Sequence, residues 1–305
     1  MRIVRDPVDM GSCVLVLGMF DGVHRGHQAL LMAGHDLACR YGLPLHVCTF
    51  EPHPLRVLRK EAAPPLLTTL PERARLMASF GVDALCVMTF RREVAAIEPE
   101  DFLAHLLQVY RPRAVVAGFN YTFGKRGRGD EHMLRTWGEK NDCEIVIVPK
   151  VELDGDTVSS TRIRGLMAKG DVHGAARLLG HAYTMSGRVM NGKRIGRTMG
   201  YPTANVEIPR NKVLPAFGVY ACWLTVGNTV YDAVVNVGRH PTLPEGAVTV
   251  EAHVLDHQLM LYGKKVRLTF LQFQRPECTF DSVEALKAQI TRDAEDARAF
   301  FAAFE

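Results

Sequence analysis

The sequence predicts two domains of different class, an α/β domain with a parallel sheet and then an antiparallel β-barrel or sandwich that ends in a helix. Three observations support this. Nearly continuous apolar runs alternate with helical patterns up to about residue 180, short β-rich runs separated by Gly, Pro and Asn follow, and an amphipathic pattern closes the chain. We place the domains at residues 1–182 and 183–305.

Five apolar runs in the first domain predict strands. Several of them are nearly continuous, as expected for strands covered on both faces. The five runs span residues 13–20, 45–50, 84–90, 113–119 and 144–149. Helical patterns separate and follow them, at residues 29–39, 71–80, 99–110, 130–140, 160–168 and 172–179. Strands that alternate with helices predict a parallel sheet with right-handed crossovers.

The second domain shows a different pattern of shorter β-rich segments. These span residues 183–190, 203–208, 219–226, 229–237, 248–255 and 266–273. Turn-forming residues separate them, which is typical of an antiparallel barrel or sandwich. A final amphipathic helix is expected at residues 282–304.

The composition fits a cytoplasmic globular protein. The 305 residues are 47% hydrophobic and 23% charged, and the formal net charge of +4 is too small to imply nucleic acid. No run approaches the ~20 apolar residues of a membrane span, and the N-terminus lacks the features of a signal peptide. We therefore expect neither a nucleic acid nor a membrane as partner, and the sequence carries no signal for an oligomeric state.

The seven cysteines predict reduced thiols. Cys13, Cys48, Cys86 and Cys222 lie inside apolar runs, and no two cysteines form a C-x-x-C pair. We expect buried thiols, with neither a disulfide framework nor a zinc site.

The segment 18–27 follows the first predicted strand and opens the first helix, which is where an α/β sheet binds ligands. Its glycines let the backbone approach a ligand, and His24 and His27 can donate to phosphate oxygens at the helix start. The segment predicts a phosphate site, although it is not G-x-G-x-x-G. One alternative is a glycine turn with two surface histidines. The other is zinc bound by His24, His27 and His53, which lacks a further ligand.

Three other polar segments have both an ordinary and a functional interpretation. Residues 159–161 suit helix N-caps or a ligand site, and Asn120 suits a turn or ligand placement. The basic residues 125–129 suit a solvated loop, a nucleic-acid contact, or a mobile loop over the site, which we favour.

The second domain contains residues suited to phosphoryl transfer. Thr203 and Asn205 offer hard oxygen atoms for Mg²⁺, and strand alternation places them on one face. Glu251 shares a face with Thr249 and His253. Spacing alone leaves Glu251 as an ordinary solvated carboxylate, with a general base as the alternative.

These motifs together resemble a known family. The string G-x-F-D-G-V-H-x-G-H at 18–27 resembles the nucleotidyltransferase superfamily and, in its full form, the bacterial bifunctional riboflavin kinase/FAD synthetases. The resemblance continues through residues 50–54, 118–124 and 159–164. In the second domain, G-x-T-x-G-x-P-T-A-N at 196–205 resembles the riboflavin kinase signature, as do residues 218–221, 236–242, 251–256 and 261–263.

The resemblance implies a Rossmann-like nucleotidyltransferase domain followed by a six-stranded antiparallel riboflavin kinase barrel with a C-terminal helix. It also implies two reactions. Riboflavin would be phosphorylated to FMN by ATP in the second domain, and FMN would be adenylylated to FAD in the first, with release of pyrophosphate. The expected small molecules are riboflavin, FMN and ATP with Mg²⁺, and FMN and FAD are the products.

The resemblance also implies roles for individual residues. Glu251 would be the general base of the kinase, and His24 and His27 would contact ATP phosphates. The remaining expected adenylyltransferase contacts are Gly18, Phe20, Asp21, Gly22, His53, Asn120, Ser160, Thr161 and Arg164. The expected kinase contacts are Gly196, Thr203, Asn205 and Asn236, with Thr203 and Asn205 holding Mg²⁺-ATP.

The chain departs from the family pattern at Met19, Asn120, Thr157 and Gln272. Thr157 removes one phosphate contact, and Gln272 stands where the family often has Lys. Three rival hypotheses remain at this point. One module alone could be active, the chain could be a flavin carrier or sensor, or it could adenylylate another phosphate such as phosphopantetheine.

Overall fold

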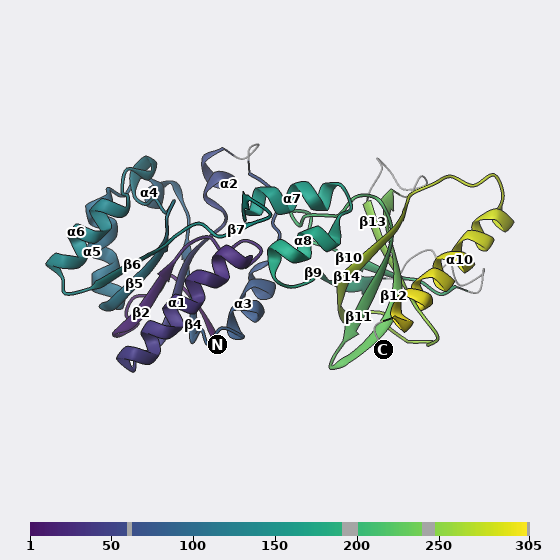
Figure 1. Ribbon diagram of the computed structural model, residues 1–305, viewed down its shortest axis with the longest axis horizontal. Helices are drawn as coiled ribbons and strands as arrows, with labels where there is room; N and C mark the ends of the chain where they lie inside the picture. Colours follow the sequence, from purple (N-terminus) through teal and green to yellow (C-terminus); the bar gives the residue numbers. More distant parts are fainter. Residues whose placement is uncertain (60–62, 191–200, 240–247, 304–305) are drawn as a thin grey trace. The chain divides into compact units, whose positions relative to one another are not determined.

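The computed structural model describes residues 1–59, 63–190, 201–239 and 248–303 (Figure 1). The chain forms two compact units, Met1–Ser159 and Ser160–Glu305. Each unit is described by itself. The predicted residues Gly196 and the loop 192–196, and residues 240–242, lie outside the described parts of the chain.

A parallel sheet forms the centre of the first unit. Its strands have the order β1-β4-β3-β2-β5-β6 within the described chain, and every neighbouring pair is parallel. The strands are β1 (Arg2–Arg5), β2 (Cys13–Leu17), β3 (Leu45–Glu51), β4 (Ala84–Thr89), β5 (Pro112–Gly118) and β6 (Glu144–Val148). A small hairpin of β7 (Glu152–Leu153) and β8 (Asp156–Thr157) lies apart from this sheet. The predicted parallel sheet is confirmed.

Helices cover both faces of this sheet (Figure 1). Helices α1 and α3 contribute to the apolar core on one face, and α5 and α6 to the core on the other. The helices of this unit are α1 (Arg25–Tyr41), α2 (Pro54–Leu58), α3 (Leu70–Ala78), α4 (Arg92–Ala95), α5 (Pro99–Tyr110) and α6 (Glu131–Lys140), with the 3₁₀ turn η2 at Lys125–Gly127.

The continuous apolar runs of the sequence follow from this two-sided cover. In β2 every residue is buried; Val14 and Val16 pack into one core, whereas Cys13, Leu15 and Leu17 pack into the other. Successive side chains of a strand point to opposite faces, so a strand covered on both faces must be apolar throughout.

Strand β1 was missed by the sequence analysis. It pairs only with β4, at the edge of the sheet, and three of its four residues are exposed. An edge strand with so little burial needs no apolar run, so its sequence gives no strand pattern. The short helices α2 and α4 were also missed, because a helix of four or five residues shows too little periodicity.

The second unit contains a closed antiparallel barrel. Its strands follow one another in the order β10-β13-β12-β11-β14-β9, and β9 pairs with both β10 and β14, which closes the ring. Within the described residues these strands are β9 (Tyr183–Met190), β10 (Ala204–Glu207), β11 (Gly218–Val226), β12 (Thr229–Arg239), β13 (Val248–Val254) and β14 (Lys265–Pro276). The structure thus selects the barrel over the sandwich.

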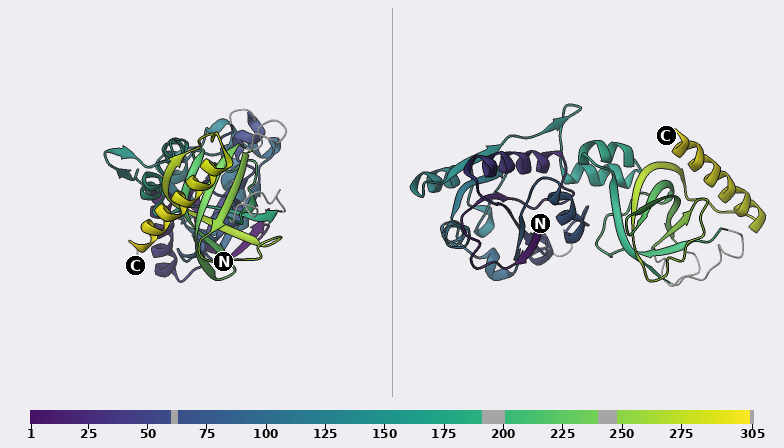
Figure 2. Two further views of the ribbon diagram at one scale, coloured as in Figure 1. Left: turned by 90° about the vertical axis from the view of Figure 1, so that its right-hand side faces the viewer. Right: turned by 90° about the horizontal axis from the view of Figure 1, so that it is seen from below.

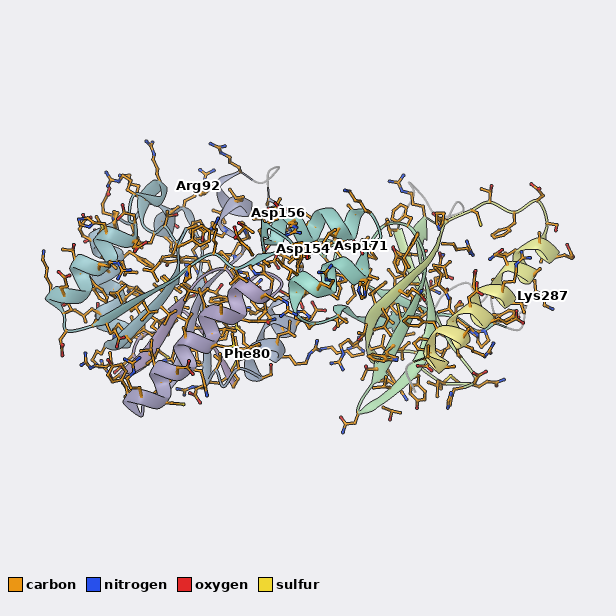
Figure 3. All side chains as sticks on the ribbon, in the orientation of Figure 1. Phe80, Arg92, Asp154, Asp156, Asp171 and Lys287 are labelled. Atoms are coloured by element: carbon orange, nitrogen blue, oxygen red, sulfur yellow. The ribbon has the colours of Figure 1, made fainter. Side chains whose placement is uncertain are left out.

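Within residues 160–190, 201–239 and 248–303, three helices accompany the barrel. The C-terminal helix α10 (Val283–Ala302) runs along its outside (Figure 2) and packs Ala294, Ala297 and Phe301 against Ala221 and neighbouring residues. The helices α7 (Ser160–Ala168) and α8 (Val172–Leu179) form a hairpin before β9. Asp171 caps α8, because its carboxylate accepts a hydrogen bond from the Gly174 N–H at 2.7 Å (Figure 3).

Close packing of α1 on the sheet yields a first prediction. A Cβ on Gly34 would lie 2.6 Å from Val16 Cγ2 and 2.9 Å from Leu45 Cδ1. We expect Gly34→Ala to lower the free energy of unfolding by about 1–3 kcal/mol, which exceeds the ~0.5–1 kcal/mol gained from helix propensity. The matched control is Gly165→Ala on α7, where nothing lies within 4 Å of the added Cβ. Chemical denaturation should show stabilisation there, and equal effects of the two changes would contradict the packing argument.

The cysteines yield a second prediction. Cys13, Cys48, Cys86, Cys143 and Cys222 are buried and free, whereas Cys39 and Cys278 are exposed. Burial raises the pKa of Cys48 to about 12 and that of Cys86 to about 11, which suppresses the reactive thiolate. We expect two thiols of the folded protein to react rapidly with Ellman's reagent and all seven to react after denaturation. Rapid reaction of a third thiol would show that the core is open.

Candidate functional site

The order of the strands determines where the first unit can bind a ligand. From β2 the chain proceeds to β3 and β4 on one side, whereas β5 and β6 lie on the other. The direction in which successive strands are added to the sheet therefore reverses between β2 and β5. In open α/β sheets, ligands bind at the carboxyl ends of the strands beside such a switch point.

The loop that follows β2, residues 18–24, lies at this position and is called the phosphate loop below. Its backbone is held in an uncommon conformation, with φ values of 56° at Phe20, 88° at Gly22 and 43° at Val23. A bulky or β-branched residue rarely adopts a positive φ, so surrounding contacts must hold Phe20 and Val23 in place. Glycine suits position 18, because a Cβ there would lie 3.1 Å from the Phe20 ring.

His24 and His27 lie together where the phosphate loop meets α1. His24 is the N-cap, and its Nδ1 accepts a hydrogen bond from the His27 N–H at 3.4 Å. The two rings are stacked, with centroids 3.6 Å apart. The positive end of the helix dipole favours an anion here, as the sequence predicted.

His27 is held in its neutral form. Burial lowers its pKa well below the ordinary value, and the nearby His24 and Arg73 lower it further. Its Nδ1 is buried and has no hydrogen-bond partner in the described part of the protein. A buried polar atom without a partner is rare, and a bound ligand would satisfy it.

Asp21 and Phe20 are turned into the protein. Phe20 is completely buried, with its ring 5.2 Å from that of His27. The Asp21 carboxylate is buried and accepts hydrogen bonds from the backbone N–H groups of Leu67 and Thr68 at 3.1 and 2.9 Å. These two side chains therefore support the phosphate loop from inside.

Asn120 and His53 follow the carboxyl ends of neighbouring strands. Asn120 lies two residues after β5, beside Gly118, and is exposed. His53 follows β3 and caps α2, because its Nδ1 accepts from the Leu55 N–H at 3.2 Å. Since β3 and β5 are the two neighbours of β2, both residues lie at the same edge of the sheet as the phosphate loop.

Two other predicted segments are placed as follows. Ser160, Thr161 and Arg164 lie in the first five residues of α7, in the second compact unit. In the basic segment, Lys125 and Arg128 both form ion pairs with Glu98. The interpretation of residues 125–129 as a mobile loop stays a prediction.

In the barrel, strand register aligns three of the predicted kinase residues. Asn205 on β10 is directly opposite Glu251 on β13, which is directly opposite Asn236 on β12. Cross-strand neighbours have Cβ atoms about 4.5–5.5 Å apart and point to the same face. All three are half-buried, whereas their neighbours Ala204, Val250 and Ala252 are buried in the barrel. The predicted alternation along β13 is thus confirmed.

The sequence analysis missed two residues that hold the start of β10. The ring of His253 lies edge-on to Tyr201 at 5.4 Å, and its Nδ1 lies 3.0 Å from the Pro202 carbonyl oxygen. Tyr201 also bonds Thr291 on α10, with the two oxygens 2.7 Å apart. These contacts position the segment that carries Thr203. The alternation along the strand placed His253 on the same face as Glu251, which was a signal for His253. Nothing in the sequence indicated the contact between Tyr201 and α10.

Gln272, one of the departures from the family pattern, lies away from this row. It is on β14, which is separated from β13 by two strands in either direction around the barrel. Gln272 lines a separate hollow with Lys169 and Phe300. Its change from the family residue therefore leaves the surroundings of Glu251 intact.

The donor atoms fit a magnesium ion bound together with a nucleotide. Asn205 supplies an amide oxygen opposite Glu251, and Thr203 supplies a hydroxyl just before β10. Mg²⁺ prefers such hard ligands while it retains water and phosphate oxygens. Within residues 1–59, 63–190, 201–239 and 248–303, no three His, Cys, Asp or Glu side chains are grouped to hold a metal. The zinc alternative for His24, His27 and His53 thus lacks a ligand set there.

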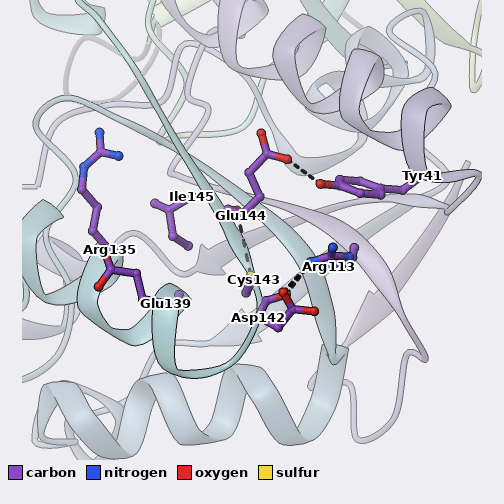
Figure 4. A pocket seen from close by; sticks show the side chains of 9 residues that line it. Tyr41, Arg113, Arg135, Glu139, Asp142, Cys143, Glu144 and Ile145 are labelled. Carbon is purple, nitrogen blue, oxygen red and sulfur yellow. Dashed lines mark hydrogen bonds and ion pairs between the residues drawn. The ribbon is translucent and has the colours of Figure 1, made fainter.

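A polar hollow of about 430 Å³ lies at the opposite edge of the parallel sheet (Figure 4). The Tyr41 hydroxyl bonds Glu144 at 2.5 Å, and Arg113 pairs with Asp142 at 3.5 Å. It borders the amino ends of β5 and β6, away from the switch point. Its carboxylates Glu144 and Asp142 are paired with Tyr41 and Arg113, so we assign the hollow no function.

Comparisons with known proteins agree with this geometry. A family model described as FAD synthetase matches residues 6–162, and one described as riboflavin kinase matches residues 179–301. The chain belongs to the bifunctional riboflavin kinase/FMN adenylyltransferase family. It is 38% identical over 296 residues to the protein of that name from Listeria monocytogenes. The matched region covers 96% of this chain and 93% of the relative.

Further relatives support the same family. The bifunctional riboflavin kinase/FMN adenylyltransferase of Escherichia coli is 38% identical over 292 residues, covering 95% of this chain and 93% of the relative. A solved structure from Streptococcus pneumoniae, named a macrolide-efflux protein, shares 32% identity with a TM-score of 0.87, over 97% of this chain and 98% of that one.

No helix among the described residues is long and apolar enough to cross a membrane.

The family confirms the predicted fold and the predicted pair of activities. The first unit carries the parallel sheet of the FAD synthetase domain, and the barrel with its C-terminal helix is the riboflavin kinase domain. The chain is therefore an enzyme, and the carrier, sensor and phosphopantetheine hypotheses are set aside.

The buried His27 yields a third prediction. Because its folded pKa is depressed, the unfolded chain binds more protons below about pH 6.5, and stability falls as the pH drops. We expect His27→Gln to flatten this loss between pH 7 and 5, by at most about 1.4 kcal/mol per pH unit for one proton. His46, whose pKa burial also lowers, leaves a residual slope in both proteins. Identical slopes in denaturation curves would show that His27 does not titrate with folding.

Proposed function

We propose that Glu251 is the general base of the riboflavin kinase reaction and that His24 and His27 are the principal phosphate contacts of the FMN adenylyltransferase reaction. The single observation that supports this pairing is a contrast between the two units. A carboxylate stands in a row of ligand-type side chains on the barrel, whereas the phosphate loop carries histidines and backbone N–H groups.

The kinase reaction needs a base. The 5′-hydroxyl of riboflavin loses its proton to the Glu251 carboxylate as its oxygen attacks the γ-phosphorus of ATP, and ADP leaves. Thr203 and Asn205 hold the nucleotide phosphates with Mg²⁺, which neutralises their charge when bound. Asn236 completes the row opposite Glu251 and orients the ligand.

The adenylyl transfer needs no base, because the FMN phosphate is already an anion. One of its oxygens attacks the α-phosphorus of ATP, and pyrophosphate leaves. Positioning and neutralisation of charge supply the catalysis. His24 and His27 contact the phosphates at the positive end of α1.

Other predicted residues complete this adenylyl site. We assign ligand placement to Asn120 and His53 at the same sheet edge, and triphosphate binding to Ser160, Thr161 and Arg164. The backbone at Gly18 and Gly22 approaches the phosphates. We further propose that the catalytic domains correspond to residues 1–182 and 183–305, and that the enzyme is cytoplasmic, with small molecules and no nucleic acid or membrane as partners.

One time course tests both activities. Pure protein is incubated with riboflavin, ATP and Mg²⁺, and the flavins are separated over time; a sample without Mg²⁺ tests the metal requirement. We expect FMN to appear first and FAD to follow. FMN without FAD would overturn the adenylyltransferase assignment, and no FMN would overturn the kinase assignment.

A fourth prediction separates the two sites. We expect Glu251→Gln to slow FMN formation from riboflavin by about 10²–10⁴-fold, because the proton acceptor is lost. Formation of FAD from supplied FMN should continue at the rate of the unchanged enzyme. The matched control is Glu207→Gln, which removes an exposed carboxylate from the neighbouring strand β10. An equal loss of both activities in Glu251→Gln would refute separate sites.

A further inference from the structure

A buried cluster of polar groups lies beneath the phosphate loop, and two of its three members, Thr68 and Arg73, lie outside every motif of the sequence analysis. It contains Asp21 of the loop, Thr68, and Arg73 of helix α3. All three are at most 4% exposed. Charged residues are almost never buried to this extent unless they are paired, so the cluster needs an explanation.

The contacts connect the loop to α3 through several bonds. Asp21 Oδ1 accepts from the N–H and hydroxyl of Thr68 at 2.9 and 3.3 Å, and Thr68 Oγ1 accepts from the Gly22 N–H at 2.9 Å. Arg73 Nη2 lies 3.9 Å from Asp21 Oδ1 and 3.4 Å from the Thr68 carbonyl oxygen, to which it donates. Arg73 thus contacts both the phosphate loop, through Asp21, and the segment before α3, through Thr68.

The start of α3 places Arg73 in this position. Thr69 is the N-cap of a capping box, and the Glu72 carboxylate accepts from the Thr69 N–H at 2.9 Å. The Arg73 N–H bonds the Thr69 carbonyl oxygen at 2.9 Å, so the first turn is fully formed. The Arg73 side chain can therefore reach back to the loop from a rigid helix.

Stability alone does not account for such a pair. A buried ion pair often contributes no more stability than apolar residues of the same size, since desolvation offsets the attraction. Burial lowers the pKa of Arg73, while Asp21 raises it. The Arg73 Nε is also buried without a partner in the described structure. The chain retains a costly arrangement at the point where Phe20 and Val23 hold positive φ values.

We propose that Arg73 is a positioning residue of the FMN adenylyltransferase site, acting through Asp21 and Thr68. The cluster holds the phosphate loop in its strained conformation, which directs both histidines toward the phosphates of ATP. Arg73 also places a permanent positive charge beneath an anion site. This inference rests on the proposed function of the phosphate loop.

The test uses Arg73→Met, which removes the charge and keeps much of the apolar stem. We expect kcat/KM for ATP in FAD formation from FMN to fall about 10–100-fold, since a misplacement of about 1 Å can cost that much. Riboflavin phosphorylation by the same preparation should be unchanged, which controls for the amount of enzyme, and a denaturation curve checks that the first unit is folded. Arg73→Lys should restore part of the loss. The matched control, Arg75→Met, removes an exposed arginine from the same helix and should leave FAD formation unchanged.

A pH profile separates positioning from simple support of the fold. Removal of the Arg73 charge raises the pKa of His27, because that charge lowers it in the unchanged protein. We expect the titration of His27 in the pH profile of kcat/KM for ATP to move to higher pH in Arg73→Met. An unmoved profile with unaltered kinetics would overturn the proposal.

A second variant covers the case in which Arg73→Met does not fold. Thr68→Val removes the hydroxyl that joins Gly22 to Asp21 and alters no charge. We expect about a tenfold loss in kcat/KM for ATP in FAD formation, with riboflavin phosphorylation retained. A folded Thr68→Val enzyme with unchanged FAD formation would overturn the proposal. If the unchanged enzyme makes no FAD at all, the proposed function itself fails, and this outcome is distinct from the others.

Discussion

The burial of β2 on both faces of the parallel sheet constrains most of the first unit. Because β2 lies between β3 and β5, the chain leaves its carboxyl end at the switch point. The phosphate loop must then turn sharply into α1, and Phe20 and Val23 accept positive φ values to do so. The strain is compatible with a stable fold because the Asp21 carboxylate and the buried Phe20 ring anchor the loop from below.

The barrel depends on a different constraint, the register of its strands. Asn205, Glu251 and Asn236 come from three strands and share a row because β10, β13 and β12 pair in one register. A slip of one residue in β13 would turn Glu251 into the apolar interior and Val250 outward. The buried valines and alanines between these polar residues make that slip costly, so the packing of the core also positions Glu251.

Much of the fold could be predicted from periodicity. The continuous apolar runs indicated strands with two covered faces, and the alternation along β13 indicated one covered face. Periodicity failed for β1, which is mostly exposed, and for the short α2 and α4. It also gave no sign of Arg73, because an arginine on an amphipathic helix ordinarily faces water. Only the fold of α3 against the phosphate loop encloses it.

The sequence by itself determined the family resemblance and, through it, the pair of activities, because its motifs stand in the family's order along both units. The spacing of residues alone left Glu251 as an ordinary solvated carboxylate. Tertiary structure alone decided which of the site residues meet and in what state. His27 is neutral because the fold buries it beside His24 and Arg73. Glu251 faces two asparagines because strands far apart in the chain are paired by hydrogen bonds. Burial and pairing arise from contacts between distant segments, which local pattern does not encode.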